Sequence, residues 1–170
     1  MKNILKNSFV FFGWLAAGLV GGLLVVNILV GLIGSLMGLD NIMNALRGIS
    51  YTLILCIAFF GMSYGYSYKN GTPELIPTIA SGALMSIYQL IIAKILKFVM
   101  YTSGGAYYFA QMFYTLRGQE APAEYETPDI VYIVIMLMLD VIHIALIILG
   151  GRIGAAKREQ ERIELTSKVK

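Results

Sequence analysis

Two residues that could do chemistry lie close together in the most apolar stretch of the chain. Asp140 and His143 stand near the middle of residues 130–149, which are otherwise apolar except for Tyr132. Twenty helical residues span about 30 Å, the thickness of the hydrocarbon core of a bilayer. A carboxylate and an imidazole at that depth are costly unless they face protein, water or a partner. The pair is therefore the first candidate for a functional site.

Helical spacing predicts that Asp140 and His143 share one stripe of their helix with Tyr132 and Met136. Polar residues of other apolar segments could join this stripe if their helices are neighbours. Side chains lean toward the N-terminus of their own helix, so a lysine on an antiparallel neighbour could approach Asp140. The candidate members from other segments are Lys94, Gln89 and Ser86 of residues 76–101, and Asn27 near the N-terminus.

Three interpretations of this polar set stay open. It could be a buried latch that fixes how the helices pair, or a site that takes up protons or a cation during transport. Histidine suits the second role because it titrates near neutrality. The Asp-x-x-His spacing could also supply two metal ligands, but the chain has a single histidine and a single cysteine, Cys56. A complete metal site would need other ligand types or a second subunit, so we predict no metal site.

The composition indicates the kind of protein in which these residues must be positioned. The chain of 170 residues is 58% hydrophobic and 14% charged, and its mean hydropathy is +0.73. Soluble domains contain about 25% charged residues, so the composition is typical of a membrane protein. We expect one transmembrane domain that occupies residues 1–170.

The predicted fold is an all-α integral membrane protein, a bundle of four transmembrane helices. The apolar runs place the spans at about 8–39, 50–68, 76–101 and 130–150, followed by a cytoplasmic tail over 151–170. The first run exceeds the roughly 20 residues that a span requires, so its helix should tilt strongly or project from the membrane.

A short amphipathic segment is predicted between the third and fourth helices. Residues 104–116 contain three tyrosines and two phenylalanines, and aromatic rings favour the level of the lipid headgroups. We expect this segment to be an interfacial helix on the outer membrane surface. In the tail, the helical spacing of Lys157 with Glu161 and of Glu159 with Arg162 predicts that the fourth helix continues beyond the membrane.

The distribution of basic residues predicts the orientation. If the N-terminus is cytoplasmic, nine of the 13 lysines and arginines fall on the cytoplasmic side of the predicted spans. Basic residues concentrate on that side of membrane proteins. We therefore expect a multi-pass protein, of a prokaryotic plasma membrane, with both termini in the cytoplasm.

Small residues recur at four-residue spacing in the first span, on more than one face of the helix. Small residues let another helix approach closely, where packing replaces the hydrophobic driving force that lipid removes. These faces could pack within the bundle or form a subunit interface. The residues are Gly13, Ala17 and Gly21, then Gly18 and Gly22, and finally Gly34 and Gly38.

The chain carries none of the common catalytic or phosphate-binding motifs, so we predict no catalytic residues and no cofactor. The net charge of +3 is too modest for a nucleic-acid partner. We expect a non-enzymatic subunit or accessory component of a larger membrane complex, whose partners are the lipid bilayer and other membrane subunits or copies of itself. The alternative is a small homo-oligomeric transporter or channel that uses Asp140 and His143, with Lys94, for proton or ion coupling.

Overall fold

A computed structural model gives the fold of the chain. The structure describes residues 2–37, 40–96, 105–120 and 130–168, apart from some side chains within these ranges. The described residues form helices and contain no strand. The helices are α1 (Lys2–Met37), α2 (Asp40–Asn70), α3 (Leu75–Leu96), α5 (Gly105–Leu116) and α6 (Ile130–Lys168).

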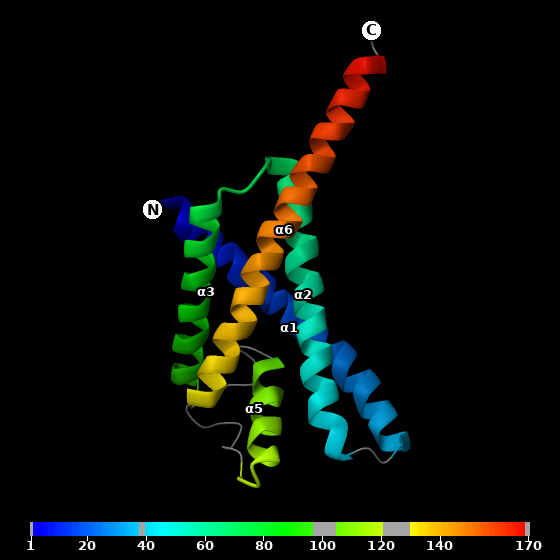
Figure 1. Cartoon of the computed structure of the whole chain (residues 1–170), viewed down its shortest axis with the longest axis vertical. Helices are drawn as coiled ribbons and strands as arrows, with labels where there is room; N and C mark the ends of the chain where they lie inside the picture. Colours follow the sequence, from blue (N-terminus) through cyan, green and yellow to red (C-terminus); the bar gives the residue numbers. More distant parts are fainter. Residues whose placement is uncertain (1, 38–39, 97–104, 121–129, 169–170) are drawn as a thin grey trace.

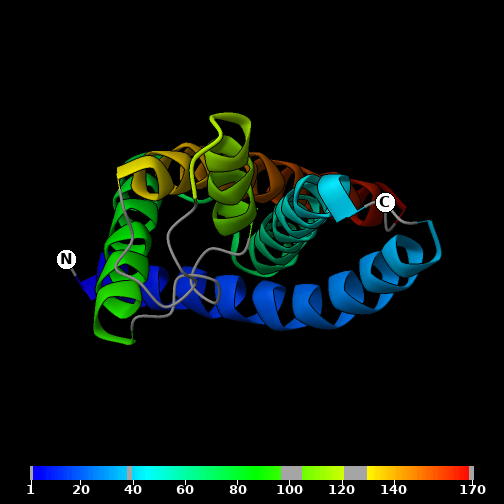
Figure 2. The same ribbon diagram turned by 90° about the horizontal axis from the view of Figure 1, so that it is seen from below.

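Four helices, α1, α2, α3 and α6, are long and apolar enough to cross a membrane. They form a ring in which α1 contacts α2, α2 contacts α6, α6 contacts α3 and α3 contacts α1. The shorter α5 packs against α2 and α6 at one end of the ring (Figures 1 and 2). The predicted all-α fold with four candidate spans is confirmed at this level.

The two ends of the bundle differ. The tail end holds the connection at residues 71–74 and the part of α6 from Arg152 onward, and both termini of the chain lie there (Figure 1). The α5 end holds α5 and the first residues of α2 and α6. α1 crosses its neighbours at a large inclination (Figure 1).

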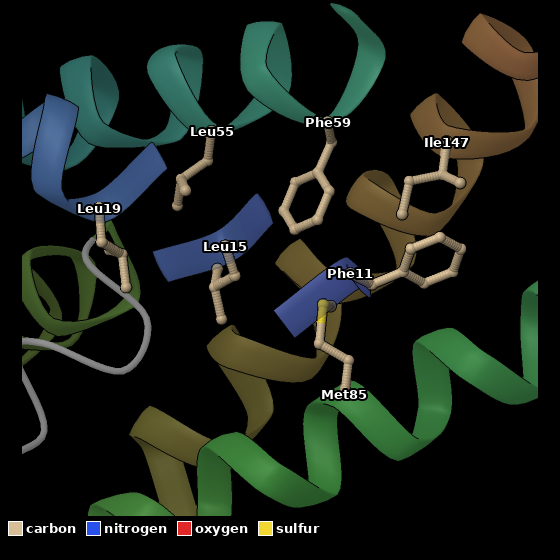
Figure 3. Packing of buried hydrophobic residues seen from close by; sticks show 7 residues of the cluster. All are labelled: Phe11, Leu15, Leu19, Leu55, Phe59, Met85 and Ile147. Carbon is tan, nitrogen blue, oxygen red and sulfur yellow. The ribbon is translucent and has the colours of Figure 1, made fainter. Parts of the chain in front are cut away.

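The main core lies where all four long helices meet, and Figure 3 shows its seven buried side chains. Large aromatic and aliphatic side chains from each helix interlock, so that dispersion contacts hold the ring together. The members are Phe11, Leu15 and Leu19 of α1, Leu55 and Phe59 of α2, Met85 of α3 and Ile147 of α6.

α2 and α6 make the most extensive helix pair because glycines bring their backbones together. A Cβ atom at Gly150 would lie 2.5 Å from the carbonyl oxygen of Phe60, and one at Gly154 would lie 2.3 Å from that of Tyr64. Close to the first crossing, the buried Ser63 hydroxyl donates a hydrogen bond of 2.5 Å to the carbonyl of Ile147. The pair is therefore fixed by close backbone contact at the tail end.

The helix bounds differ from the predicted spans in two places. α2 begins at Asp40, ten residues before the predicted start of the second span. Polar residues interrupt the apolar ones in its first turns and so hide these turns from a hydropathy pattern, but the turns contain no proline and continue the helix. α6 runs without a break from Ile130 to Lys168 and so includes most of the predicted tail. The predicted end of the third span, residues 97–101, lies outside the described residues.

The predicted helix at residues 104–116 exists as α5, but it lies lengthwise along α2 and α6 rather than across the end of the bundle (Figure 1). Its first turn packs closely on α2, because a Cβ atom at Gly105 would lie 3.1 Å from the carbonyl oxygen of Gly48. The ring of Tyr108 stacks on that of Tyr51, with centroids 5.6 Å apart. Small residues and ring stacking thus favour this position.

Candidate functional site

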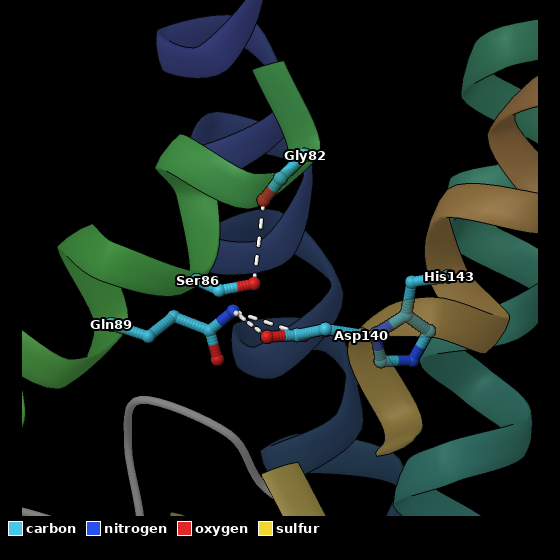
Figure 4. A network of polar contacts seen from close by, with 5 residues as sticks. All are labelled: Gly82, Ser86, Gln89, Asp140 and His143. Atoms are coloured by element: carbon cyan, nitrogen blue, oxygen red, sulfur yellow. Dashed lines mark hydrogen bonds and ion pairs between the residues drawn. The ribbon is translucent and has the colours of Figure 1, made fainter. Parts of the chain in front are cut away.

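The buried carboxylate of Asp140 is held by the third span. The Nε2 group of Gln89 donates to both carboxylate oxygens, at 3.1 Å to Oδ1 and 3.3 Å to Oδ2 (Figure 4). Asp140 is 3% exposed and Gln89 is fully buried. α3 and α6 are neighbours, and Gln89, expected only as a possible member of the polar network, is the residue of α3 that bonds to Asp140.

His143 lies beside Asp140 on the same face of α6. Its Nδ1 atom is 3.6 Å from Oδ1 of Asp140, which is an ion-pair distance rather than a hydrogen bond. The imidazole packs against the ring of Phe59 on α2, with the ring centroids 4.8 Å apart. The histidine is 3% exposed, so α2 and α6 enclose it almost completely.

Three buried polar atoms of this cluster have no hydrogen-bond partner among the described residues. They are Nδ1 and Nε2 of His143 and Oε1 of Gln89. Each buried polar atom without a partner costs about 1–3 kcal/mol. The site therefore has hydrogen-bonding capacity that a water molecule, a proton or a small cation could use.

The other predicted members of the polar set are placed differently. Tyr132 is buried in a cluster with Ala106 and Ala110 of α5, and eight residues of helix separate it from Asp140 by about 12 Å. The Ser86 hydroxyl donates to the carbonyl of Gly82 on its own helix, at 3.3 Å. The side chains of Asn27 and Lys94 lie outside the described part of the structure.

The described residues hold no group of three or more His, Cys, Asp or Glu side chains that could bind a metal ion. Asp140 and His143 thus stand as a pair, as the spacing predicted. Gln89 adds an amide rather than a third strong metal ligand. The arrangement suits proton or hydrogen-bond chemistry better than metal coordination.

The small residues of α1 divide into an inner set and an outer set. A Cβ atom at Gly18 would lie 2.8 Å from Cδ2 of Leu55, and one at Gly22 would lie 2.9 Å from Cδ1 of Tyr51, so both face α2. Gly13, Ala17 and Gly21 are exposed, and nothing described lies within 4 Å of a Cβ atom at either glycine. We call these three residues the α1 outer face. Of the other predicted positions, Gly34 belongs to the part of α1 whose side-chain surroundings are not described, and Gly38 lies outside the described residues.

Two structural features of the site region escaped sequence reasoning. Gly150 and Gly154 follow the same four-residue spacing as the glycines of α1 and could have been recognised as a packing face. Phe59, which covers the imidazole of His143, gives no such signal because it is one of many aromatic residues in an apolar run.

Comparisons of the chain with protein-family models, with curated proteins and with solved structures find no match.

Proposed function

We propose that this chain is a non-enzymatic, multi-pass membrane protein that works as a subunit or accessory component of a larger membrane complex. The observation that carries the proposal is the α1 outer face. The ring of helices leaves Gly13, Ala17 and Gly21 uncovered on its outside. The absence of recognisable catalytic motifs in the sequence supports a non-enzymatic role.

The α1 outer face fits a transmembrane helix of another polypeptide. Its small residues expose the backbone of α1, so that a second helix could approach closely and gain dispersion contacts. Glycine in a helix costs about 1 kcal/mol relative to alanine, and a face that only touched lipid would gain nothing from it. The inner glycines, Gly18 and Gly22, already allow such a close approach within the bundle, because side chains of α2 pack directly against them.

The proposed orientation places the tail end, with both termini, in the cytoplasm of a prokaryotic cell. The excess of lysines and arginines on that side supports this orientation. α5 then lies at the outer side of the plasma membrane. Arg117, whose guanidinium lies over the ring of Phe113 at 4.4 Å, would stand at the outer headgroup level.

Purification from the native membrane in mild detergent, followed by native mass spectrometry, tests the proposal. The wild-type protein should carry other polypeptides, and Gly21→Leu should lose them. Val141→Leu is the control, because it also enlarges an exposed apolar position, 67% exposed on α6, that is not part of an exposed glycine stripe. Gly18→Leu is unsuitable, since the new side chain would collide with Leu55 inside the bundle. Retention of all partners by Gly21→Leu would reject this interface.

A second candidate function, a small homo-oligomeric transporter or channel, rests on the unpartnered nitrogens of His143 and the amide oxygen of Gln89. If the cluster served only to hold helices together deep in a membrane, all of its buried polar atoms should have hydrogen-bond partners. A site that exchanges protons or ions instead needs polar atoms that are free to bind them. Four helices rarely enclose a pathway, so this function requires self-association. Lys94 would complete the coupling set.

Proton flux into vesicles that contain a pH-sensitive dye tests the second candidate. Asp140→Asn keeps the size of the side chain and should abolish the flux while the protein remains folded. A homo-oligomer alone in native mass spectrometry, together with loss of flux in this variant, would favour transport over the subunit role. Full flux in the variant would reject coupling at Asp140.

A further inference from the structure

A second polar region, separate from the buried cluster, lies at the tail end. There α6 extends past the connection between α2 and α3, and a hollow of about 550 Å³ opens between them. Gly71 and Thr72 of the connection line one side of the hollow. Charged residues of α6 line the other side: Arg152, Arg158, Glu159 and Arg162.

The charge of this hollow is positive. The single glutamate that lines it, Glu159, is paired with Arg162 at 2.8 Å. Glu161, on the adjacent face, pairs with Lys157 at 3.8 Å. Arg152 and Arg158 make no ion pair with any carboxylate of the described residues. The hollow therefore presents two guanidinium groups that are available to an anion.

The walls of the hollow are held in place by packing. A Cβ atom at Gly151 would lie 2.6 Å from Cγ of Pro73 and 3.0 Å from Oγ of Ser67, so the connection rests directly on α6. The hydroxyl of Tyr68 donates to the carboxylate of Glu161, which ties the extension of α6 to the end of α2. The two arginines thus project from a helix whose backbone is held in place, so that an anion would have to order only their side chains.

The position of Arg152 indicates the source of that anion. It is the first basic residue after the apolar run of α6, so it would stand where the hydrocarbon core meets the headgroups. Arginine matches phosphate because its planar fork donates two parallel hydrogen bonds. Anionic lipids concentrate in the cytoplasmic leaflet, and the tail end is the proposed cytoplasmic end.

We propose that this hollow binds the phosphate group of an anionic phospholipid, with Arg152 and Arg158 as its ligands. Arg152 contacts the phosphate at the membrane surface. Arg158, six residues further along α6, is displaced by about 9 Å along the helix axis and attracts the outer part of the headgroup. The assignment to a lipid rests on the proposed orientation of the chain, but not on the complex partner or on any role of Asp140.

Lipid retention by the purified full chain tests this proposal. The wild-type protein in neutral detergent should retain phosphatidylglycerol over phosphatidylcholine by about tenfold in native mass spectrometry, a 1.4 kcal/mol difference. Added phosphatidylglycerol should also raise the unfolding temperature, because a ligand of the folded state stabilises it. The double variant Arg152→Gln and Arg158→Gln should lose both effects. Arg117→Gln, at the α5 end, should keep them.

Further variants and controls distinguish a specific lipid site from general charge attraction, from misfolding and from a site for free phosphate. Arg152→Lys keeps the charge but loses the planar fork, so its retention should fall between that of the wild type and that of the double variant. Circular dichroism should show unchanged helicity in every variant. Equal retention of both lipids, or equal retention by the wild type and the double variant, would overturn the proposal. Stabilisation by inorganic phosphate but not by phosphatidylglycerol would overturn the assignment to a lipid.

Discussion

At the scale of single residues, Asp140 depends on one neutral donor from another helix. The amide of Gln89 gives both hydrogen bonds that the carboxylate receives from α3. Removing one partner of a buried hydrogen bond leaves the other unsatisfied, whereas removing both is far less costly. The pair therefore couples α3 to α6 in a way that substitution can measure.

A double-mutant cycle on Gln89 and Asp140 should show strong coupling. Gln89→Leu and Asp140→Leu should each lower the free energy of unfolding by about 1–3 kcal/mol, because each leaves a buried polar partner. The double variant should be less destabilised than the sum of the two, by about 0.5–3 kcal/mol. Thermal or chemical unfolding in detergent measures these values. Additive effects would contradict the interhelical bond.

Replacing His143 by an apolar residue should not lower the free energy of unfolding, in contrast to the changes at Gln89 and Asp140. His143→Leu removes two buried nitrogens without partners, each of which costs about 1–3 kcal/mol. It also loses the contact with the ring of Phe59, worth about 0.5–1.5 kcal/mol, and the contact of Nδ1 with Asp140, which at 3.6 Å is too long for a hydrogen bond. We expect unchanged or higher stability in detergent, measured by thermal unfolding. A loss above about 2 kcal/mol would show that the imidazole makes a hydrogen bond in the folded protein.

At the scale of elements, glycines determine how the helices approach one another. Gly154→Ala would place a methyl group 2.3 Å from the carbonyl oxygen of Tyr64 and force α2 and α6 apart. We expect a loss of about 1–3 kcal/mol in detergent unfolding experiments. Gly65→Ala is the matched control, because its Cβ position meets nothing within 4 Å. That change should be neutral or raise stability by up to about 1 kcal/mol. Equal effects of the two changes would contradict the close crossing.

Element positions were predictable from the sequence where apolar runs alone define them. The four long runs predicted the four long helices. The antiparallel order of the last two predicted an approach of Lys94 to Asp140, with Gln89 as a possible member of the same network. Gln89 does bond to Asp140, and the side chain of Lys94 lies outside the described part of the structure. The start of α2 at Asp40 was not predictable from hydropathy, because a helix needs no apolar residues to continue. The lengthwise position of α5 depends on contacts with Gly48 and Tyr51, which are distant in sequence.

The division of the α1 glycines also required the structure. All of them share the same four-residue spacing, and only the position of α2 separates the inner Gly18 and Gly22 from the outer face. A sequence pattern can indicate that a helix has two faces of small residues. It cannot tell which face the rest of the chain covers, since that depends on tertiary packing.

At the scale of the whole molecule, four helices close a ring, and small residues lie on its outside at two places, the α1 outer face and Gly61 with Gly65 of α2. The large apolar residues on the exterior, such as Leu53 and Ile57 of α2, suit contact with lipid tails. The α1 outer face differs from them because it exposes helix backbone. This contrast is the basis of the proposal that α1 meets another subunit while the large apolar side chains of the exterior meet lipid.

Site-directed photo-crosslinking in the native membrane tests that claim most directly. A photoreactive residue at Ala17, in the centre of the α1 outer face, should crosslink to a defined second polypeptide. The same residue at Ile57, which is 70% exposed on α2, should react mainly with lipid. A discrete protein adduct from position 17 and none from position 57 is the result we expect. Lipid adducts alone from both positions would contradict the account.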